Sequence, residues 1–371
     1  MIKNFLISFK NLIYITETFK KNTNIVFFSE GRNHWNFIKP FINALQKQIN
    51  SNNIKYLTQD CHDNAFVEIN KNIEVLYIGS GRVRDYIISN INASILFTTS
   101  PDINQFQVKK SKFCLSYCYI QHSLNSLHMA YNELAFDIYD KFFICGDHHK
   151  REIRKIIKKY NWPEKELYES IYSPLLDLKK ITKNKKITKN TILIAPTWGH
   201  NSIIESRKIF EILDLLLPKK FFIYLRPHPE TSKHYKNLLL EISNKYIKYK
   251  HFFLEESISN YDSLIKSDFL ITDWSGIAFD YALGLKKQIL FINTTPKIKN
   301  KNYDLISEVP IEIRCRNKFG IQVSDIKNLL SKINKIKNRN KINNTFEHFY
   351  DISPEDTIKK LIEKNSFLKE K

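Results

Sequence analysis

Two histidines follow apolar runs that predict β-strands, and their side chains have the chemistry of proton transfer. His122 comes after the run LSYCYI, and His228 lies between Pro227 and Pro229, which stiffen its loop and limit where the ring can point. Imidazole takes up and releases protons near neutral pH. We therefore expect His122 to act as a general base and His228 to act in the same reaction. A purely structural role is the alternative for His122.

Polar residues also follow three predicted strands in the second half of the chain: Thr197 and Trp198, then Arg226, then the run Asp273-Trp274-Ser275-Gly276. In a parallel sheet all such loops emerge at the carboxyl edge, where doubly wound folds bind their ligands. Proline, glycine and aspartate can form an ordinary turn in any one loop. Coincidence across three loops is the weaker explanation, so we predict that they converge on one site.

The run around Ser275 and Gly276 is the most specific of the three. A buried apolar strand leads through it directly into a helix, FLITDWSGIAFDYALGLKKQILFI. The free amides and the dipole at a helix N-terminus attract anionic groups such as a diphosphate. Ser275 as an ordinary N-cap is the alternative for the same position. For Arg226, contact with phosphate and pairing with a carboxylate both stay open.

The composition favours a folded, basic protein with anionic partners. The 371 residues include 58 basic and 38 acidic side chains, for a formal net charge of +20. Such an excess favours nucleic acid, an anionic membrane surface or phosphate-rich substrates. Five cysteines without a CxxC pair argue against a disulfide framework and favour a reducing compartment. We expect Cys114 and Cys118 in the core.

The amino terminus bears on location. No apolar run approaches the roughly 18 residues that span a bilayer, and Lys10 interrupts the terminus before a signal-peptide core develops. We therefore expect a cytoplasmic protein. The apolar residues of Ile2–Phe19 nevertheless fall on one helical face, with lysines elsewhere. That helix either packs on its own domain or lies on the inner face of the cell membrane.

The chain alternates short apolar runs with helical patterns, the rhythm of βαβ units and parallel sheets. The run KKITKNKKITKN, residues 179–190, contains six lysines and almost no apolar side chains, which is typical of a linker. We expect one α/β domain over 1–178 and a second over 191–371. Ser353, with proline next and Asp356 at the third helical position, predicts a capped final helix.

The expected strands are 25–29, 73–78, 94–97, 114–120, 141–145, 191–195, 221–225, 251–254, 269–272 and 288–292. Three helices are expected over about 203–217, 232–246 and 276–285. Asn293–Arg316 has no regular pattern, and a further helix is expected from about Val323. Parallel strands then place the strand-end residues of each domain at a single edge.

Several common site motifs are missing from the sequence. Without GxGxxG or GxxxxGK[ST], a dinucleotide dehydrogenase or P-loop ATPase has little support, and we expect no cofactor. The absence of Asp-x-Asp weakens a metal-dependent transferase. His148 and His149 lack further ligands at suitable spacing, so we expect no metal. A non-catalytic nucleic-acid-binding protein would explain the charge but not the strand-end motifs, and we expect no nucleic-acid partner.

Taken together and in order, these segments resemble the CDP-glycerol glycerophosphotransferase family, the polymerases and primases of teichoic-acid and related capsule synthesis. Pro196-Thr197-Trp198 is similar to the family's Ala-Pro-Thr-Trp segment, and Arg226-Pro227-His228-Pro229 to its His-Pro loop. Asp273-Trp274-Ser275-Gly276 is similar to its Asp-Tyr-Ser-Ser donor loop, and Phe279-Asp280 to the Phe-Asp that follows. Gln121-His122-Ser123 stands where the family carries Trp-His-Gly, with only His122 in common.

The resemblance implies an α/β, GT-B-like fold of two Rossmann-type domains facing a central cleft, with the nucleotide donor held by the second domain. It implies metal-independent transfer of glycerol phosphate, or a similar alditol phosphate, from a CDP-activated donor to a polymer or lipid-linked acceptor. His122 would accept the hydroxyl proton, and His228 and Ser275 would stabilise the phosphoryl oxygens. The other residues expected to bind the donor are Thr197, Trp198, Arg226, Asp273, Trp274, Gly276 and Asp280.

One departure from the family pattern leaves the donor open. Gly276 stands where the family carries a second serine, so one hydroxyl is missing from the expected diphosphate site. The donor could then be another CDP-alditol. A GT-B glycosyltransferase that uses a nucleotide sugar in capsule or lipooligosaccharide synthesis is the alternative function, because such enzymes also place a nucleotide diphosphate at this helix end.

Overall fold

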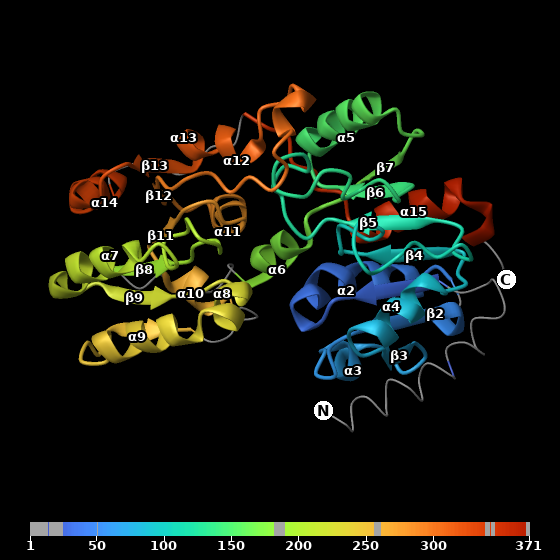
Figure 1. The fold of residues 1–371 in the computed structure, drawn as a ribbon, viewed down its shortest axis with the longest axis horizontal. Coiled ribbons are helices and arrows are strands. Elements are labelled where there is room, and N and C mark those ends of the chain that lie inside the picture. Colours follow the sequence, from blue (N-terminus) through green and yellow to red (C-terminus); the bar gives the residue numbers. More distant parts are fainter. Residues whose placement is uncertain are drawn as a thin grey trace. The chain divides into compact units, whose positions relative to one another are not determined.

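The computed structural model describes residues 14, 25–49, 51–181, 190–255, 261–337, 342 and 346–368. In this part of the chain the structure divides into two compact units, and Figure 1 labels their elements. Unit 1 is drawn from Met1–Ser173, Lys299–Glu308 and His348–Lys371. Unit 2 is drawn from Pro174–Ile298 and Val309–Glu347. Two later segments of the chain thus return to unit 1.

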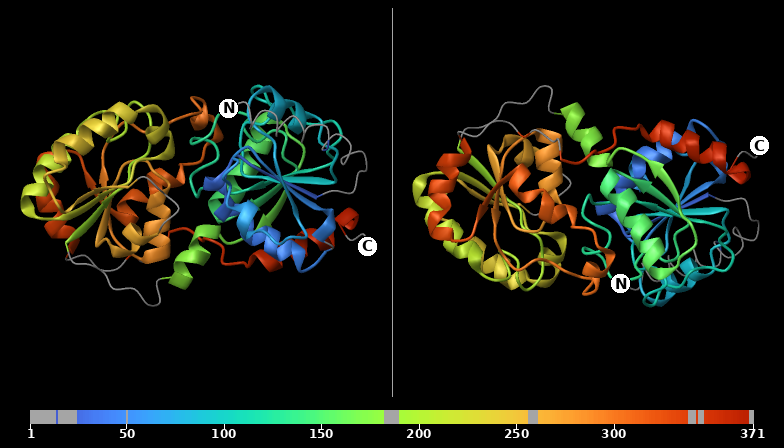
Figure 2. Two further views of the ribbon diagram at one scale, coloured as in Figure 1. Left: turned by 90° about the horizontal axis from the view of Figure 1, so that it is seen from below. Right: turned by 90° about the horizontal axis from the view of Figure 1, so that it is seen from above.

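Unit 1 contains a seven-stranded parallel sheet with helices on both faces (Figure 2). Its strands are β1 (Ile25–Ser29), β2 (Ile54–Thr58), β3 (Glu74–Tyr77), β4 (Ile95–Thr98), β5 (Tyr117–Ile120), β6 (Lys141–Ile144) and β7 (Glu166–Glu169). Its helices are α2 (Arg32–Gln46), α3 (Ala65–Glu68), α4 (Arg82–Ser89), α5 (Asp147–Tyr160) and α15 (Pro354–Lys364), with short turns η1 (Ser51–Asn53), η5 (Tyr303–Ile306) and η7 (Ser366–Leu368). The strand order is β3-β2-β1-β4-β5-β6-β7.

The central strands of unit 1, such as β1, are apolar on both faces. Successive side chains of a strand point to opposite faces of the sheet. On β1, Val26 and Phe28 join a core that includes residues of α4 and α5, whereas Ile25 and Phe27 join a second core with α2 and α15. A parallel sheet covered by helices on both sides therefore needs continuous apolar runs, which is why the strands stand out in the sequence.

Unit 2 contains a six-stranded parallel sheet in the order β10-β9-β8-β11-β12-β13. Its strands are β8 (Thr191–Ile194), β9 (Phe222–Leu225), β10 (Phe252–Leu254), β11 (Phe269–Thr272), β12 (Ile289–Ile292) and β13 (Gly320–Val323). Helix α6 (Ser173–Ile181) begins at the boundary between the units. The other helices are α7 (Lys208–Leu216), α8 (Pro229–His234), α9 (Lys236–Tyr246), α10 (Asp262–Lys266), α11 (Ile277–Phe279), α12 (Ile311–Arg314), α13 (Arg316–Phe319) and α14 (Leu329–Lys337), with turns η3 (Leu217–Lys219) and η6 (Ile326–Asn328) and a π-helical turn η4 (Asp280–Gly284).

The predicted α/β class with two Rossmann-type sheets is confirmed. Each expected strand matches an observed strand to within three residues at either end, whereas β2, β7 and β13 were not expected. The helix expected over 203–217 begins only at Lys208, and the one over 232–246 is interrupted at Tyr235. The helix expected from Gly276 is a short α-helical turn that continues as the π-helical turn η4.

The division of the chain differs from the expected domains 1–178 and 191–371. Helix α15 belongs to unit 1, because Ile358 and Leu361 complete the apolar core against α2. The start of this helix is as predicted, since the Ser353 hydroxyl accepts a hydrogen bond from Asp356 N at 3.1 Å and Pro354 follows the cap. Local capping therefore indicates where a helix begins, but not which core it completes.

Some expectations fall outside the described residues. The apolar face of Ile2–Phe19 and most of the linker 179–190 belong to this group. Within the described ranges, no helix combines the length and the apolar character needed to cross a membrane. Cys114 and Cys118 are buried as expected, and all five cysteines are free thiols.

Candidate functional site

Four adjacent parallel strands of the unit 2 sheet, labelled in Figure 1, each lead into a loop at the carboxyl edge. The adjacent strands β9, β8, β11 and β12 are followed by loops that carry His228, Trp198, Ser275 and Lys297 respectively. Neighbouring strands lie about 4.8 Å apart, so side chains from these loops can share one ligand. The three loops predicted to converge are therefore neighbours, and a fourth loop joins them.

Asp273 holds two of these loops together. Its carboxylate accepts hydrogen bonds from Thr197 N at 2.7 Å, Trp274 N at 2.7 Å and Ile203 N at 3.0 Å. Burial raises the pKa of this carboxyl, and the three N–H donors act against the rise. We expected Asp273 to contact a donor, but its oxygens are used by the backbone. Its position in the structure is that of an organiser of the loops.

Arg316, which no sequence pattern singles out, supports the same loop. Its guanidinium donates to the carbonyl oxygens of Asp273 at 2.7 Å and Ile292 at 3.3 Å, and its central carbon lies 4.3 Å from the Trp274 ring centroid. Burial lowers the pKa of Arg316 to about 10. The Trp274 indole donates to Thr294 O at 3.0 Å. Trp274, which we expected to bind the nucleotide donor, is therefore held in one orientation by Arg316 and Thr294.

The start of α11 leaves backbone donors unused. Ala278 N and Phe279 N donate back to Ser275 O at 3.2 Å and Gly276 O at 3.0 Å. Among the described residues, the N–H groups of Ser275, Gly276 and Ile277 find no acceptor, and the helix has no side-chain cap. Ser275 is therefore not an ordinary N-cap. Its hydroxyl and these N–H groups are placed as donors to an anion.

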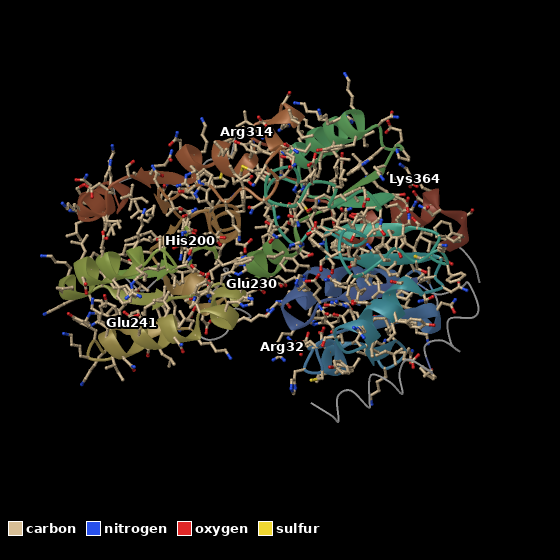
Figure 3. All side chains as sticks on the ribbon, viewed as in Figure 1. Arg32, His200, Glu230, Glu241, Arg314 and Lys364 are labelled. Carbon is tan, nitrogen blue, oxygen red and sulfur yellow. The ribbon has the colours of Figure 1, made fainter. Side chains whose placement is uncertain are left out.

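His228 caps the short helix α8 through its ring. Nδ1 accepts a hydrogen bond at 3.2 Å from the backbone N–H of Glu230, which is labelled in Figure 3. The proton of the neutral ring therefore lies on Nε2. Burial, and to a smaller extent the charge of Lys297, lower the His228 pKa to about 3. The result is a neutral imidazole with an oriented Nε2 donor, 6.1 Å from the Trp198 ring between centroids.

The buried Arg226 side chain forms an ion pair with Glu255. Its Nε donates to Glu255 Oε2 at 2.6 Å, and Nη2 donates to Ser263 Oγ at 2.7 Å. Of the two possibilities left open for Arg226, pairing with a carboxylate is the one observed. The expected donor residue Asp280 lies near it: burial raises the Asp280 pKa to about 7, and the charge of Arg226 opposes the rise. The Asp280 Oδ1 atom is buried without a hydrogen-bond partner in the described part of the chain.

Lys297, which also has no distinctive sequence pattern around it, reaches the loop that follows β8. Its Nζ donates to Thr197 Oγ1 at 3.2 Å and lies 4.3 Å from the Trp198 ring centroid. Thr197 is buried and Trp198 is half-buried. The two predicted donor-binding residues of this loop thus contact the same ammonium group.

His122 lies at the carboxyl edge of the unit 1 sheet, directly after β5. Its Nδ1 is 2.9 Å from the Tyr119 hydroxyl, and its Nε2 is 3.4 Å from the Tyr131 hydroxyl. Tyr172 donates to the His122 carbonyl at 3.2 Å. Burial, then repulsion from His34, lowers the His122 pKa to about 3. The ring is therefore neutral at pH 7, the form that a general base requires.

His34, on the first turn of α2, accompanies His122 and was not expected. The two ring centroids lie 5.6 Å apart. The His34 Nδ1 is 2.8 Å from Thr99 Oγ1, and its Nε2 is 3.9 Å from Glu30 Oε2. Burial lowers the pKa of His34, while the charge of Glu30 acts in the opposite direction. Unit 1 thus presents two imidazoles from the ends of β1 and β5.

The turn that places His34 depends on Gly31. Its φ is +138°, and an added Cβ would lie 2.9 Å from the Cβ of Asp60. Only glycine adopts this conformation without strain. His34 follows the end of β1 by five residues, whereas His122 follows β5 by two. A wider window after each predicted strand would therefore have included His34.

His148 and His149 begin α5 and support the segment after His122. The His148 Nε2 is 3.0 Å from Leu124 O, and the His149 Nε2 is 3.2 Å from Asn125 O. Burial lowers the His149 pKa to about 3. Both rings therefore bind backbone carbonyls. In the described ranges, no group of three or more His, Cys, Asp or Glu side chains is placed to hold a metal ion.

A comparison with protein families identifies the chain. The model of the family CDP-Glycerol:Poly(glycerophosphate) glycerophosphotransferase matches residues 15–351. The chain belongs to this family. The resemblance inferred from the strand-end motifs is therefore confirmed, and the glycerophosphotransferase match includes the carboxyl edges of both sheets.

One curated relative in the glycerophosphotransferase family is the teichoic acid poly(glycerol phosphate) polymerase of Bacillus spizizenii. It is 30% identical over 200 residues, which cover 49% of this chain and 45% of the relative. This chain thus spans about half the length of the relative.

Solved structures agree with the fold. UDP-GlcNAc 2-epimerases of Methanocaldococcus jannaschii and Neisseria meningitidis align with TM-scores of 0.60 and 0.62 and identities of 15% and 13%. Each alignment covers 92% of this chain, and 99% and 100% of the respective epimerase. Wall teichoic acid polymerase TagF aligns over 98% of this chain and 96% of its own, with 17% identity and a TM-score of 0.48. At identities this low, the two epimerase alignments show a common fold alone.

Proposed function

We propose that this protein transfers glycerol phosphate, or a similar alditol phosphate, from a CDP-activated donor to a hydroxyl group of a cell-surface polymer or lipid-linked acceptor. The observation that carries the proposal is the family match over residues 15–351. The unused N–H groups at Ser275–Ile277 support it, because they suit a donor that contains a diphosphate. The released nucleotide in this proposal is CMP.

The proposed reaction is a displacement at the phosphorus that carries the glycerol. The acceptor oxygen forms a new bond to this phosphorus, and the bond to the bridging oxygen breaks, so that CMP leaves with that oxygen. The acceptor hydroxyl proton goes to His122. Phosphoryl transfer of this kind depends mainly on positioning and on stabilising charge.

His122 has contacts that fit the role of base. Nε2 makes the longer of the two ring contacts, 3.4 Å to the Tyr131 hydroxyl, and we propose that the acceptor hydroxyl replaces this contact. The shorter contact of Nδ1 with Tyr119 then orients the ring. An anionic substrate beside the ring would raise its pKa, which would favour uptake of the proton.

His228 and Ser275 fit the role of stabilising phosphoryl oxygens. The His228 ring is neutral, with Nδ1 occupied by the Glu230 N–H, so Nε2 can donate. The Ser275 hydroxyl and the adjacent N–H groups add oriented donors, which need little reorganisation when charge develops. We propose that these donors act without a metal ion, so turnover should survive EDTA. Loss of turnover with EDTA and recovery with manganese or magnesium would contradict this part.

An anionic membrane surface is the proposed location of the acceptor. The net charge of +20 supports it, because each lysine or arginine near an anionic surface contributes about 1 kcal/mol. Flotation with liposomes that contain or lack anionic lipid tests this part. Absence of binding to anionic liposomes at low salt would make a soluble acceptor the better choice.

A screen of nucleotide-activated donors tests the function itself. The purified protein is incubated with CDP-glycerol, another CDP-alditol or a UDP-sugar, and the nucleotide product is identified. Release of CMP is the expected result. Release of CDP or UDP would instead favour the alternative function, a glycosyltransferase that uses a nucleotide sugar. Gly276 stands where the family has a second serine, and this difference is compatible with another donor.

A further inference from the structure

The Lys297 side chain reaches from the loop after β12 to the loop after β8, two strands away in the sheet of unit 2. It follows β12, yet its ammonium group contacts Thr197 Oγ1 at 3.2 Å and the Trp198 ring at 4.3 Å, both in the loop after β8. In the sheet, β11 lies between β12 and β8. The lysine therefore reaches across the carboxyl end of β11, the strand that leads to the unused N–H groups of Ser275–Ile277.

The charge of Lys297 also acts on His228. It is one of the two causes that lower the His228 pKa, so the ammonium group lies within electrostatic reach of the imidazole. A lysine, a neutral imidazole donor and unused backbone N–H groups thus gather at the same edge. Each of them can donate a hydrogen bond to an anion, and the lysine adds a positive charge.

The contacts of Lys297 differ from those of the nearby arginines. Arg316 donates to backbone carbonyls, and Arg226 pairs with the Glu255 carboxylate. Lys297 instead touches a hydroxyl and the face of an indole ring. Both are weaker partners for an ammonium group than a phosphate, which forms charge-assisted hydrogen bonds. A diphosphate at this edge would therefore be a stronger partner for the Lys297 ammonium group than either of these two contacts.

We propose that Lys297 binds the diphosphate of the donor and neutralises the charge that develops on the leaving nucleotide. The inference rests on the proposed function, because it takes a nucleoside diphosphate group as the ligand of this edge. When the bond to the bridging oxygen breaks, the electron pair stays on the leaving phosphate. A lysine at this place stabilises that charge more in the transition state than in the ground state.

Nucleotide binding to the full chain tests the role of Lys297 without turnover. Isothermal titration with CDP and with cytidine is carried out on the wild type, Lys297→Met and Lys297→Arg. Methionine removes the charge at similar length, and Lys297→Arg keeps it. We expect Lys297→Met to weaken CDP binding at least about tenfold and to leave cytidine binding unchanged, since a charge-assisted contact to phosphate is lost. Lys297→Arg should retain most of the affinity for CDP.

Lys219→Met is the matched control. Lys219 is exposed and ends η3, just before β9 begins, and so lies toward the amino end of the same sheet. The substitution makes the same change in net charge away from the carboxyl edge. We expect wild-type affinity for CDP. An equal loss of affinity in Lys219→Met and Lys297→Met would show a general charge effect and overturn the proposal.

The outcomes separate this inference from the proposed function. Release of CMP from CDP-glycerol together with unchanged CDP affinity in Lys297→Met overturns the role of Lys297 alone. If the wild type prefers UDP to CDP, the proposed donor is wrong, and the same variants are compared with UDP and uridine. A wild-type protein that binds no nucleoside diphosphate overturns both proposals.

Discussion

The carboxyl edges of the two sheets are built from similar parallel strands but carry different chemistry. In unit 1, the edge presents imidazoles that contact hydroxyl groups: His34 beside Thr99, and His122 beside Tyr119 and Tyr131. In unit 2, the edge presents unused backbone N–H groups at Ser275–Ile277. The first arrangement suits proton transfer, and the second suits anion binding.

The two edges differ in chemistry because their charged and polar side chains have different hydrogen-bond partners. In unit 2, the Asp273 carboxylate accepts hydrogen bonds from backbone N–H groups, and the Arg316 guanidinium donates hydrogen bonds to backbone carbonyls. These charged side chains fix the loops, so the remaining donors are held in place for a ligand. In unit 1, neutral hydroxyl groups orient the rings of His34 and His122. Similar sheets can therefore divide binding and proton transfer between them.

His228→Ala tests the binding edge and has the largest expected effect. Loss of the oriented Nε2 donor should lower turnover at least about a hundredfold and weaken CDP binding. Loss of the cap on α8 should cost about 1 kcal/mol of stability, so the protein should stay folded. CMP release and CDP titration measure the two effects. His234→Ala, at the other end of the same helix, is the control, and near wild-type turnover in folded His228→Ala would remove the proposed role.

His122→Ala tests the proton-transfer edge. Turnover should again fall at least about a hundredfold, because a general base is lost. Affinity for CDP should not change, since His122 belongs to unit 1 and the donor is assigned to unit 2. The exposed His62→Ala is the control. Loss of CDP affinity in His122→Ala comparable to that in His228→Ala would contradict the division between the two edges.

Strand ends were predictable from the sequence because they depend on local patterns. Continuous apolar runs mark the central strands, and the polar residues that follow them are the ones found at the carboxyl edges. Two of the three missed strands, β7 and β13, are weaker patterns. β7 has the sequence ELYE, with charged residues at both ends, and β13 has the sequence GIQV. Both are the last strand at one edge of their sheet. An edge strand has a neighbouring strand on one side only, so it needs fewer apolar side chains than a central strand.

The missed site residues depend on contacts between distant parts of the chain. Lys297 meets Thr197 across 100 positions, and Arg316 meets Asp273 across 43. Both come from a region without a regular sequence pattern, so neither periodicity nor a strand end draws attention to them. For the same reason, the role of Asp273 could not be predicted, and the sequence left open whether Arg226 contacts phosphate or pairs with a carboxylate. Only the structure shows that their charged groups are used by the protein itself.

Asp280→Asn tests whether the carboxyl group near the binding edge is protonated in the folded protein. Burial raises its pKa to about 7, whereas in the unfolded chain it titrates near 3.9. Between these values unfolding releases a proton, so the free energy of unfolding falls as pH rises, and it levels off above about 7. Asparagine cannot ionise. From pH 5 to 7, the variant should therefore gain about 2 to 3 kcal/mol relative to the wild type.

Urea unfolding at several pH values measures this difference. Glu211→Gln, an exposed carboxylate on α7, is the control and should follow the wild type. His122 and His149 in unit 1 have lowered pKa values and should contribute the opposite trend, since their unfolded forms take up protons as pH falls below about 6.5. A variant that runs parallel to the wild type from pH 5 to 8 would mean that Asp280 is ionised in the folded protein.

Ser275→Ala has the smallest expected effect and separates the two possible uses of the serine. As an N-cap, the serine would stabilise the protein, and alanine would cost about 1 kcal/mol. The structure shows no such cap, so the free energy of unfolding should stay at the wild-type value. Turnover should still fall about tenfold, because one of several hydroxyl and N–H donors to the phosphoryl oxygens is lost. The neighbouring N–H groups are unaffected by the substitution, which is why the loss should be smaller than in His228→Ala. Loss of stability with unchanged turnover would instead show that the hydroxyl serves the helix and not the ligand.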